Sequence, residues 1–434
     1  MDSVNMKVDN IDSTVTVIKA GLLIPGRGDP IKAAAVVIEA GKLKYVGLAI
    51  DLPSTYQSYP TIKVPYLMPG LWDCHCHLFG TTTLSAEAAI QTPQSLAGAY
   101  VARDMVVILR AGFTSVRDVG GYGCEISKGV NQGILLGPNI YSAGAIISQT
   151  GGHGDTHGLL IKHVHDYCNH GNGVPICLAD GRDECRIAVR KQLRRGASLI
   201  KICTSGGVLS LSDDPRHQQF SEEELEVIVE EASRAHRIVA AHAHGKPGIM
   251  AALRAGCKTV EHGTWGDDES FALMKEKDAI LVPTRTVVAA GVQMGQKMLP
   301  PESVVKMQLI ADVHRSMYAK AVQSGVRIAL GADLLSSLPG TPVSNGLNGL
   351  EVVYAVEAGM TPLQAIECCT ANGPLTLGRQ APKSGIIQEG YDADLIALME
   401  DPLKEIKVLA EPEKITHVWK GGKLVKKPGD SGCI

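Results

Sequence analysis

The sequence predicts an α/β fold, a (β/α)8 TIM barrel that carries a small β-sandwich domain formed by both termini. Two observations predict the barrel: short apolar or β-branched segments recur along the chain, and helical patterns separate them. Strands that alternate with helices indicate a parallel sheet, and eight such repeats are typical of a (β/α)8 barrel. The candidate strands are the segment before residue 75 and the segments 113–119, 139–144, 199–205, 238–244, 259–263, 279–284 and 327–333.

The predicted helices have recognisable starts and apolar faces. In the segment 221–236, Ser221 and Glu224 have the spacing of a capping box, in which each side chain bonds to the backbone N–H of the other residue. Another helix is predicted to begin after Thr361, because proline follows this N-cap residue at the first helical position. The apolar stripe of the first helix consists of Leu225, Ile228, Val229 and Ala232.

The two ends of the chain have a different pattern. Residues 14–66 and 384–425 contain strand–turn–strand patterns with glycine at the turns. We interpret them as two halves of one β-sandwich domain, assigned to residues 1–66 and 384–434. The metal-dependent hydrolase barrel is then assigned to residues 67–383.

The composition is that of a globular protein of enzyme size. With 434 residues, 45% of them hydrophobic and 20% charged, the chain can bury a large core. The formal net charge of -3 gives no reason to expect nucleic acid or an anionic membrane as a partner, and no transmembrane run is evident.

The cysteines and the N-terminus indicate a reducing compartment. The eleven cysteines are an odd number and include no repeated CxxC pair at zinc-finger spacing, so they do not predict a disulfide scaffold. The first twenty residues lack the apolar segment of a secretory signal. The sequence therefore predicts a cytoplasmic protein.

Candidate metal ligands follow the predicted strands. His75 and His77 alternate at the end of the first strand, so both imidazoles should face one point, and neutral imidazole is a common zinc ligand. In a (β/α)8 barrel these positions lie at the C-terminal face, where active sites are built. Each residue alone favours a structural role, such as a core histidine or a capping aspartate, whereas the whole set favours a metal site. The other candidates, each at the end of an apolar run, are Lys201, His242, His244, His262 and Asp333.

The ordered motifs resemble the metal-dependent amidohydrolase superfamily over essentially the whole chain. They include Pro-Gly-Leu-Trp-Asp-Cys-His-Cys-His (69–77), the barrel lysine, the two later histidines, the terminal aspartate and Gly-Ile-Ile-Gln-Glu-Gly-Tyr-Asp-Ala-Asp-Leu (385–395). Within the superfamily the chain is most similar to the branch of Xaa-Pro dipeptidases and fungal ochratoxinase-like enzymes. That similarity depends on Arg-Asp-Val-Gly-Gly-Tyr-Gly (117–123), Ser-Gln-Thr-Gly-Gly-His-Gly-Asp (148–155), Lys-Ile-Cys-Thr-Ser-Gly-Gly-Val (201–208) and His-Val-Trp-Lys-Gly-Gly-Lys (417–423).

The resemblance implies two divalent metal ions, with zinc as the first choice. Lys201, carbamylated by CO2, would bridge both ions. Lysine as an ammonium has no lone pair to offer a cation, and burial in an apolar strand disfavours the ammonium, so carbamylation would replace it by a bridging anion. The remaining ligands would be His75, His77 and Asp333 for one ion, and His242 and His262 for the other.

The resemblance also implies roles in catalysis and substrate binding. Asp333 would accept a proton from the attacking water and deliver it to the leaving nitrogen. His244 should share a face with His242; it would contact the substrate or stabilise the oxyanion, or else support the ligands from behind. His153 lies in a glycine-rich loop, where we expect it to contact the substrate's carboxylate; a loop-stabilising His-Asp pair is the alternative.

These features predict a binuclear-metal amidohydrolase that cleaves the C-terminal amide bond of N-acyl amino acids or dipeptides with a metal-activated hydroxide. Its substrate would be a small-molecule amide. The same residues also fit a cyclic amidohydrolase of the imidazolonepropionase or dihydropyrimidinase type. A non-catalytic scaffold with the amidohydrolase fold fits less well, because it predicts missing ligands. The resemblance further implies a homo-oligomer.

Overall fold

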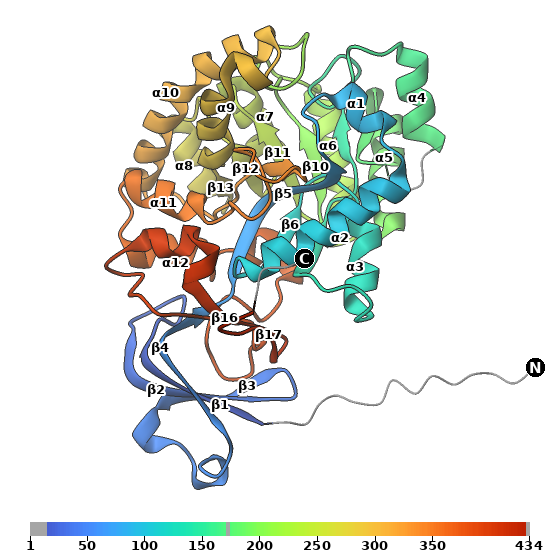
Figure 1. Cartoon of the computed structure of the whole chain (residues 1–434). Helices are drawn as coiled ribbons and strands as arrows, with labels where there is room; N and C mark the ends of the chain where they lie inside the picture. Colours follow the sequence, from blue (N-terminus) through green and yellow to red (C-terminus); the bar gives the residue numbers. More distant parts are fainter. Residues whose placement is uncertain (1–14, 171–173, 431–434) are drawn as a thin grey trace, which may run out of the picture.

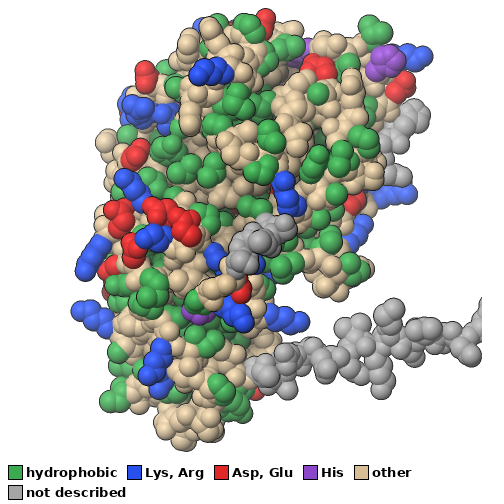
Figure 2. All heavy atoms as spheres, in the orientation of Figure 1, with side chains coloured by type: hydrophobic (Ala, Val, Ile, Leu, Met, Phe, Trp, Pro, Cys, Tyr) green, Lys and Arg blue, Asp and Glu red, His purple; other side chains and the backbone are tan. Residues whose placement is uncertain are grey.

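The computed structural model describes residues 15–170 and 174–430 (Figure 1). The first fourteen residues, which include most of the segment used to predict the absence of a secretory signal, lie outside the described residues. Among the helices that are described, none is both long and apolar enough to span a bilayer. On the face drawn in Figure 2, acidic and basic side chains lie close to one another, in keeping with the nearly balanced net charge.

Strands from both ends of the chain form one seven-stranded mixed sheet in the order β17-β16-β15-β4-β1-β2-β3. The two ends meet where β15 pairs antiparallel with β4, with Leu395 opposite Pro69. This sheet lies below the rest of the molecule in Figure 1, and buried side chains that include Leu67 and Trp419 pack on it. The bounds are β1 (Thr16–Leu23), β2 (Ile31–Glu39), β3 (Lys42–Leu48), β4 (Thr61–Pro69), β15 (Leu395–Leu398), β16 (Ile415–Lys420) and β17 (Lys423–Lys426).

The remainder is a TIM-barrel-like α/β fold built on two parallel sheets, ordered β14-β5-β6-β7 and β13-β12-β11-β10-β8-β9. The central strands are buried along their whole length, which explains why they read as continuous apolar runs. The bounds are β5 (Leu71–Thr81), β6 (Phe113–Asp118), β7 (Asn139–Ser142), β8 (Ile146–Ser148), β9 (Ile176–Leu178), β10 (Ile200–Cys203), β11 (Val239–Ala243), β12 (Thr259–His262), β13 (Ile280–Val282) and β14 (Leu334–Ser336).

Helices surround these sheets (Figure 1), and the predicted caps are confirmed. The capping box of Ser221 and Glu224 starts α6, and Thr361 caps α12 with Pro362 inside the first turn. The bounds are α1 (Ala86–Gln91), α2 (Gln94–Arg110), α3 (Gly123–Asn131), α4 (Ile161–His170), α5 (Gly181–Arg195), α6 (Glu222–Arg234), α7 (Lys246–Ala255), α8 (Asp268–Glu276), α9 (Arg285–Met298), α10 (Pro301–Ser324), α11 (Leu350–Glu357) and α12 (Pro362–Cys368).

The predicted last strand, 327–333, is only partly regular. Its backbone bonds to β13 on one side, where Ala329 N–H donates to Leu281 O at 3.1 Å, and to β5 on the other, where Cys74 N–H donates to Leu330 O at 2.8 Å. The continuous strand β14 nevertheless begins only at Leu334. Asp333 has a left-handed φ of 57°, which interrupts the extended backbone where the carboxylate turns into the site.

Candidate metal and substrate site

His75 and His77 lie next to each other on the buried strand β5, and each uses Nδ1 for a protein contact. Nδ1 of His75 lies 2.7 Å from Glu261 Oε2, and Nδ1 of His77 lies 2.9 Å from the carbonyl of Gly120. Because the Nδ1 atoms are engaged, the Nε2 atoms remain for a ligand role. They lie 3.5 Å and 3.2 Å from Asp333 Oδ1.

Asp333 is held by its own backbone. Its N–H donates to the carbonyl of His75 at 2.7 Å, which ties the turn to β5. Behind this turn, the buried carboxylate of Asp73 accepts hydrogen bonds from the N–H groups of His75 and Ala332 at 3.0 and 3.1 Å. Asp73 therefore links the strand that carries the two histidines to the segment that carries Asp333.

A second group consists of His242, His244 and His262, at the ends of β11 and β12. Nδ1 of His244 contacts Thr264 Oγ1 at 2.7 Å, and Nδ1 of His262 contacts Thr284 Oγ1 at 2.8 Å. In each of the two groups, the candidate ligand atoms lie within 4.8 Å of one another. The rings of His75 and His262 are 5.0 Å apart, so the two groups face one cavity.

Burial keeps these imidazoles neutral, which is the form that binds metal. Burial lowers the pKa of His75 to about 4 and that of His244 to about 3. Burial and the neighbouring histidines hold the pKa values of His242 and His262 well below the usual range.

Lys201 lies in the middle of β10, 2% exposed, and lines the same cavity. Among the described residues no carboxylate lies within ion-pair distance of its Nζ. Burial lowers the pKa of Lys201 and so favours the neutral amine. A neutral amine is the form that can react with CO2.

Glu261 contacts His75 and is itself held by Arg117. The sequence did not predict this role of the two residues. Arg117 Nη2 donates to both carboxylate oxygens of Glu261 at 2.8 Å, and its Nε donates to the carbonyl of Cys74 at 2.5 Å. Both side chains are fully buried. Burial raises the pKa of Glu261, but Arg117 and His75 outweigh this effect and hold the pKa well below its usual range. The signal that could have indicated this role is that Arg117 and Glu261 are charged residues inside apolar strands.

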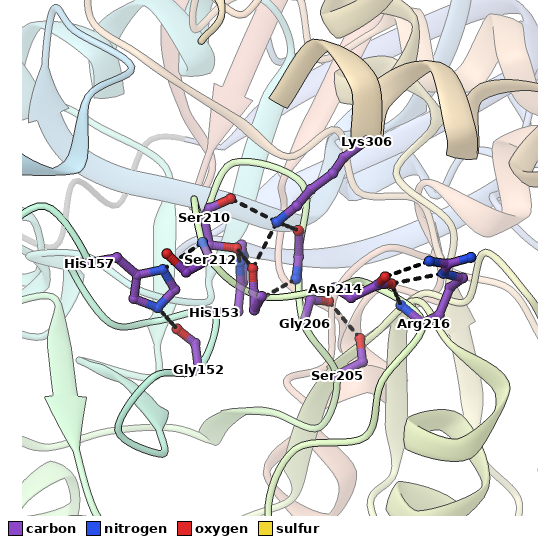
Figure 3. A network of polar contacts seen from close by, with 12 residues as sticks. Gly152, His153, His157, Ser205, Gly206, Ser210, Ser212, Asp214, Arg216 and Lys306 are labelled. Carbon is purple, nitrogen blue, oxygen red and sulfur yellow. Dashed lines mark hydrogen bonds and ion pairs between the residues drawn. The ribbon is translucent and has the colours of Figure 1, made fainter. Parts of the chain in front are cut away.

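The shared cavity has a volume of about 210 Å³ and combines the polar groups above with an apolar wall. His153 also lines it, stacked on His242 with 4.2 Å between ring centroids. Nδ1 of His153 lies 2.9 Å from Ser210 Oγ, within the polar network drawn in Figure 3. A loop-stabilising His-Asp pair is the alternative to a substrate contact; among the described residues Nδ1 of His153 contacts Ser210 instead. The apolar wall includes Leu84, Val287, Val288, Met307, Ile310 and Leu335.

Comparison with known proteins gives consistent matches. The sequence model of the Amidohydrolase family matches residues 66–425. Ochratoxinase of Aspergillus niger is 49% identical over 430 residues, which cover 96% of this chain and 88% of that protein. The crystal structure of A. niger ochratoxinase superposes with a TM-score of 0.91 at 48% identity, covering 97% of each chain. The crystal structure of a Xaa-Pro dipeptidase with bound methionine in the active site has a TM-score of 0.83 at 32% identity, covering 95% of this chain and 100% of that one.

Proposed function

The chain belongs to the amidohydrolase family and is a hydrolase of amide bonds. We propose that it is a binuclear-metal enzyme that cleaves the C-terminal amide of N-acyl amino acids or dipeptides. The observation that carries the proposal is the pair of ligand groups that face one cavity, with Lys201 on the same cavity wall. The names of the similar proteins, ochratoxinase and Xaa-Pro dipeptidase, support this substrate class.

The donor set fits two divalent cations. The Nε2 atoms of His75 and His77 are left free by their Nδ1 contacts and lie beside a carboxylate, and such nitrogen and oxygen donors suit zinc. Lys201 as a carbamate would bridge the two ions. In this assignment His75, His77 and Asp333 would hold one ion, and His242 and His262 would hold the other.

When bound, the ions would polarise the scissile carbonyl and lower the pKa of the attacking water. Asp333 takes the proton of that water and delivers it to the leaving nitrogen, so that an amine and an acid are released. His244, whose Nδ1 is engaged by Thr264, presents Nε2 to the developing oxyanion. His153 contacts the substrate carboxylate.

The apolar wall favours a substrate with an apolar group next to the scissile bond. Side chains from α9, α10 and β14 contribute to this wall, and burying an apolar group there would stabilise the complex.

The organisation of the molecule is part of the same proposal. Segment 327–333 would close the barrel between β13 and β5, as its backbone hydrogen bonds suggest. The barrel would comprise residues 67–383 and the β-domain residues 1–66 and 384–434. We also propose that the protein is cytoplasmic and forms a homo-oligomer.

The test is release of free amino acid from a panel of dipeptides and N-acyl amino acids, ochratoxin A included, by the metal-loaded enzyme. Cyclic amides are assayed in parallel, because ring opening releases no fragment. Amino-acid release supports the proposal and ranks the side-chain preference. Ring opening without release from any linear amide would instead support a cyclic amidohydrolase.

A further inference from the structure

Lys306 of α10 reaches across to the loop that follows β10, and Figure 3 shows its ammonium among the polar groups of that loop. Nζ donates to the carbonyls of Gly207 and Ser210 at 3.1 and 2.9 Å and to Asp213 Oδ1 at 2.9 Å. The side chains of Lys306 and Asp213 are 13% and 5% exposed, so this ion pair is largely shielded from water. Such an ion pair is screened much less than one at the surface.

Asp213 is saturated with donors. Its Oδ2 accepts from Gly207 N–H at 2.9 Å and from Gln219 Nε2 at 3.2 Å, and its Oδ1 accepts from the Ser210 hydroxyl as well as from Lys306. A carboxylate with four donors has little freedom to rotate. Asp213 therefore fixes where Ser210 points.

The direction of these hydrogen bonds also determines which ring nitrogen of His153 contacts the protein. Ser210 has one hydroxyl hydrogen and gives it to Asp213, so its oxygen accepts the hydrogen of His153 Nδ1 at 2.9 Å. The backbone N–H of His153 also donates to Gln219 Oε1 at 3.0 Å. Nδ1 is thereby assigned to the protein, and Nε2 is the ring atom left for the substrate.

The loop backbone is shaped to this ring. A Cβ at Gly207 would lie 2.0 Å from His153 Nδ1, so only glycine allows the loop to pass so close. His157 also links the loop that carries His153 to the loop that follows β10. Its Nδ1 accepts from Ser212 N–H at 3.0 Å, and its Nε2 donates to the carbonyl of Gly152 at 3.1 Å (Figure 3).

We propose that Lys306 and Asp213 are positioning residues that act through Ser210 to set the orientation of His153, and that they thereby make the enzyme selective for substrates with a free carboxylate. The proposal rests on the proposed function, because it assigns Nε2 of His153 to that carboxylate. It adds a specificity determinant on a helix remote in sequence from the loops it controls.

Kinetics on matched substrates test the role. Lys306→Met should raise KM for an N-acyl amino acid about tenfold, the loss expected when one charge-assisted hydrogen bond is misplaced. KM for the corresponding amino-acid amide should change less than about threefold, and so should kcat on the acid. Lys306→Arg should restore most of the discrimination, and Asp213→Asn should lose it. Lys320→Met, which removes an exposed lysine of the same helix, is the control and should behave like the wild type.

Three results would overturn the proposal: an equal change of KM on acid and amide, a loss of kcat alone, or a loss of bound metal in Lys306→Met. Crystal structures of Lys306→Met and Lys306→Arg give a readout that does not need turnover. The Ser210–His153 contact should be broken in the first and retained in the second; its retention in both contradicts the positioning role. A wild type that cleaves no linear amide would refute the proposed function, while these two structures still decide the positioning.

Discussion

Replacing Glu261 by glutamine should weaken metal binding without changing any ligand. Glu261 accepts the Nδ1 hydrogen of His75 at 2.7 Å, and the negative charge behind the ring makes Nε2 a stronger donor to a cation. Loss of such a carboxylate costs about 10- to 100-fold in metal affinity. At 25 °C, a 10- to 100-fold loss of affinity corresponds to about 1.4 to 2.7 kcal/mol of metal-binding free energy.

The same substitution should also destabilise the metal-free protein. Arg117 is fully buried and has Glu261 as its ion-pair partner, so Glu261→Gln leaves a buried guanidinium without a compensating charge. Breaking a buried pair from one side costs about 3 to 5 kcal/mol. Arg117→Met breaks the pair from the other side but leaves the carboxylate on His75, so its effect on metal affinity should be smaller than that of Glu261→Gln.

The assay combines chelator competition for metal affinity with urea unfolding of the metal-free protein. The double variant Arg117→Met/Glu261→Gln removes both charges, so it should lose less free energy of unfolding than the sum of the two single variants. Wild-type metal affinity in Glu261→Gln would refute the proposed effect on His75. Additive losses in the double variant would show that the two charges are not coupled.

Two further predictions concern Lys201 and Asp394. Lys201→Met should bind less metal and release no amino acid. The metal-free wild type should recover activity faster when it is reconstituted with zinc and bicarbonate than with zinc in CO2-free buffer. Equal recovery in both buffers would contradict the carbamate. Burial raises the pKa of Asp394 from 3.8 to about 6, although Gly421 N–H opposes the shift, so the folded state holds its proton more tightly. The contribution of this group to the free energy of unfolding is fully present below pH 4. It is lost as the pH rises to about 6, and the loss amounts to about 3 kcal/mol. Asp394→Asn should remove this loss, because an amide does not titrate. Unfolding free energies of both proteins from pH 4 to 7 test this prediction, and a constant difference between them would contradict it.

The sequence predicted those parts of the molecule that depend on local pattern. The apolar runs that end at His77, His242 and His262 are strands, and the residues at their ends meet because parallel strands place their carboxyl ends on one side. The caps at Ser221 and Thr361 were predictable because a capping box, or an N-cap residue followed by proline, needs at most four consecutive residues.

Contacts between distant segments were not predictable in the same way. Arg117 and Glu261 are 144 positions apart, and Lys306 and Asp213 are 93 apart, so no local pattern indicates that they pair. The short strands β8 and β9 were also missed, since three residues give too little periodicity. The regular part of the last strand was predicted too early, because the left-handed backbone at Asp333 has no signal in an apolar run.

Amino-acid release by wild type and by Asp333→Asn at equal metal content is the most direct test of the proposed chemistry. Asparagine keeps the shape and one oxygen donor but cannot take the proton of the water. We expect the wild type to release amino acid and release by Asp333→Asn to fall by at least about 100-fold, the lower range for losing a general acid–base group. Release at the wild-type rate by a fully metal-loaded Asp333→Asn would contradict the role of Asp333 in proton transfer.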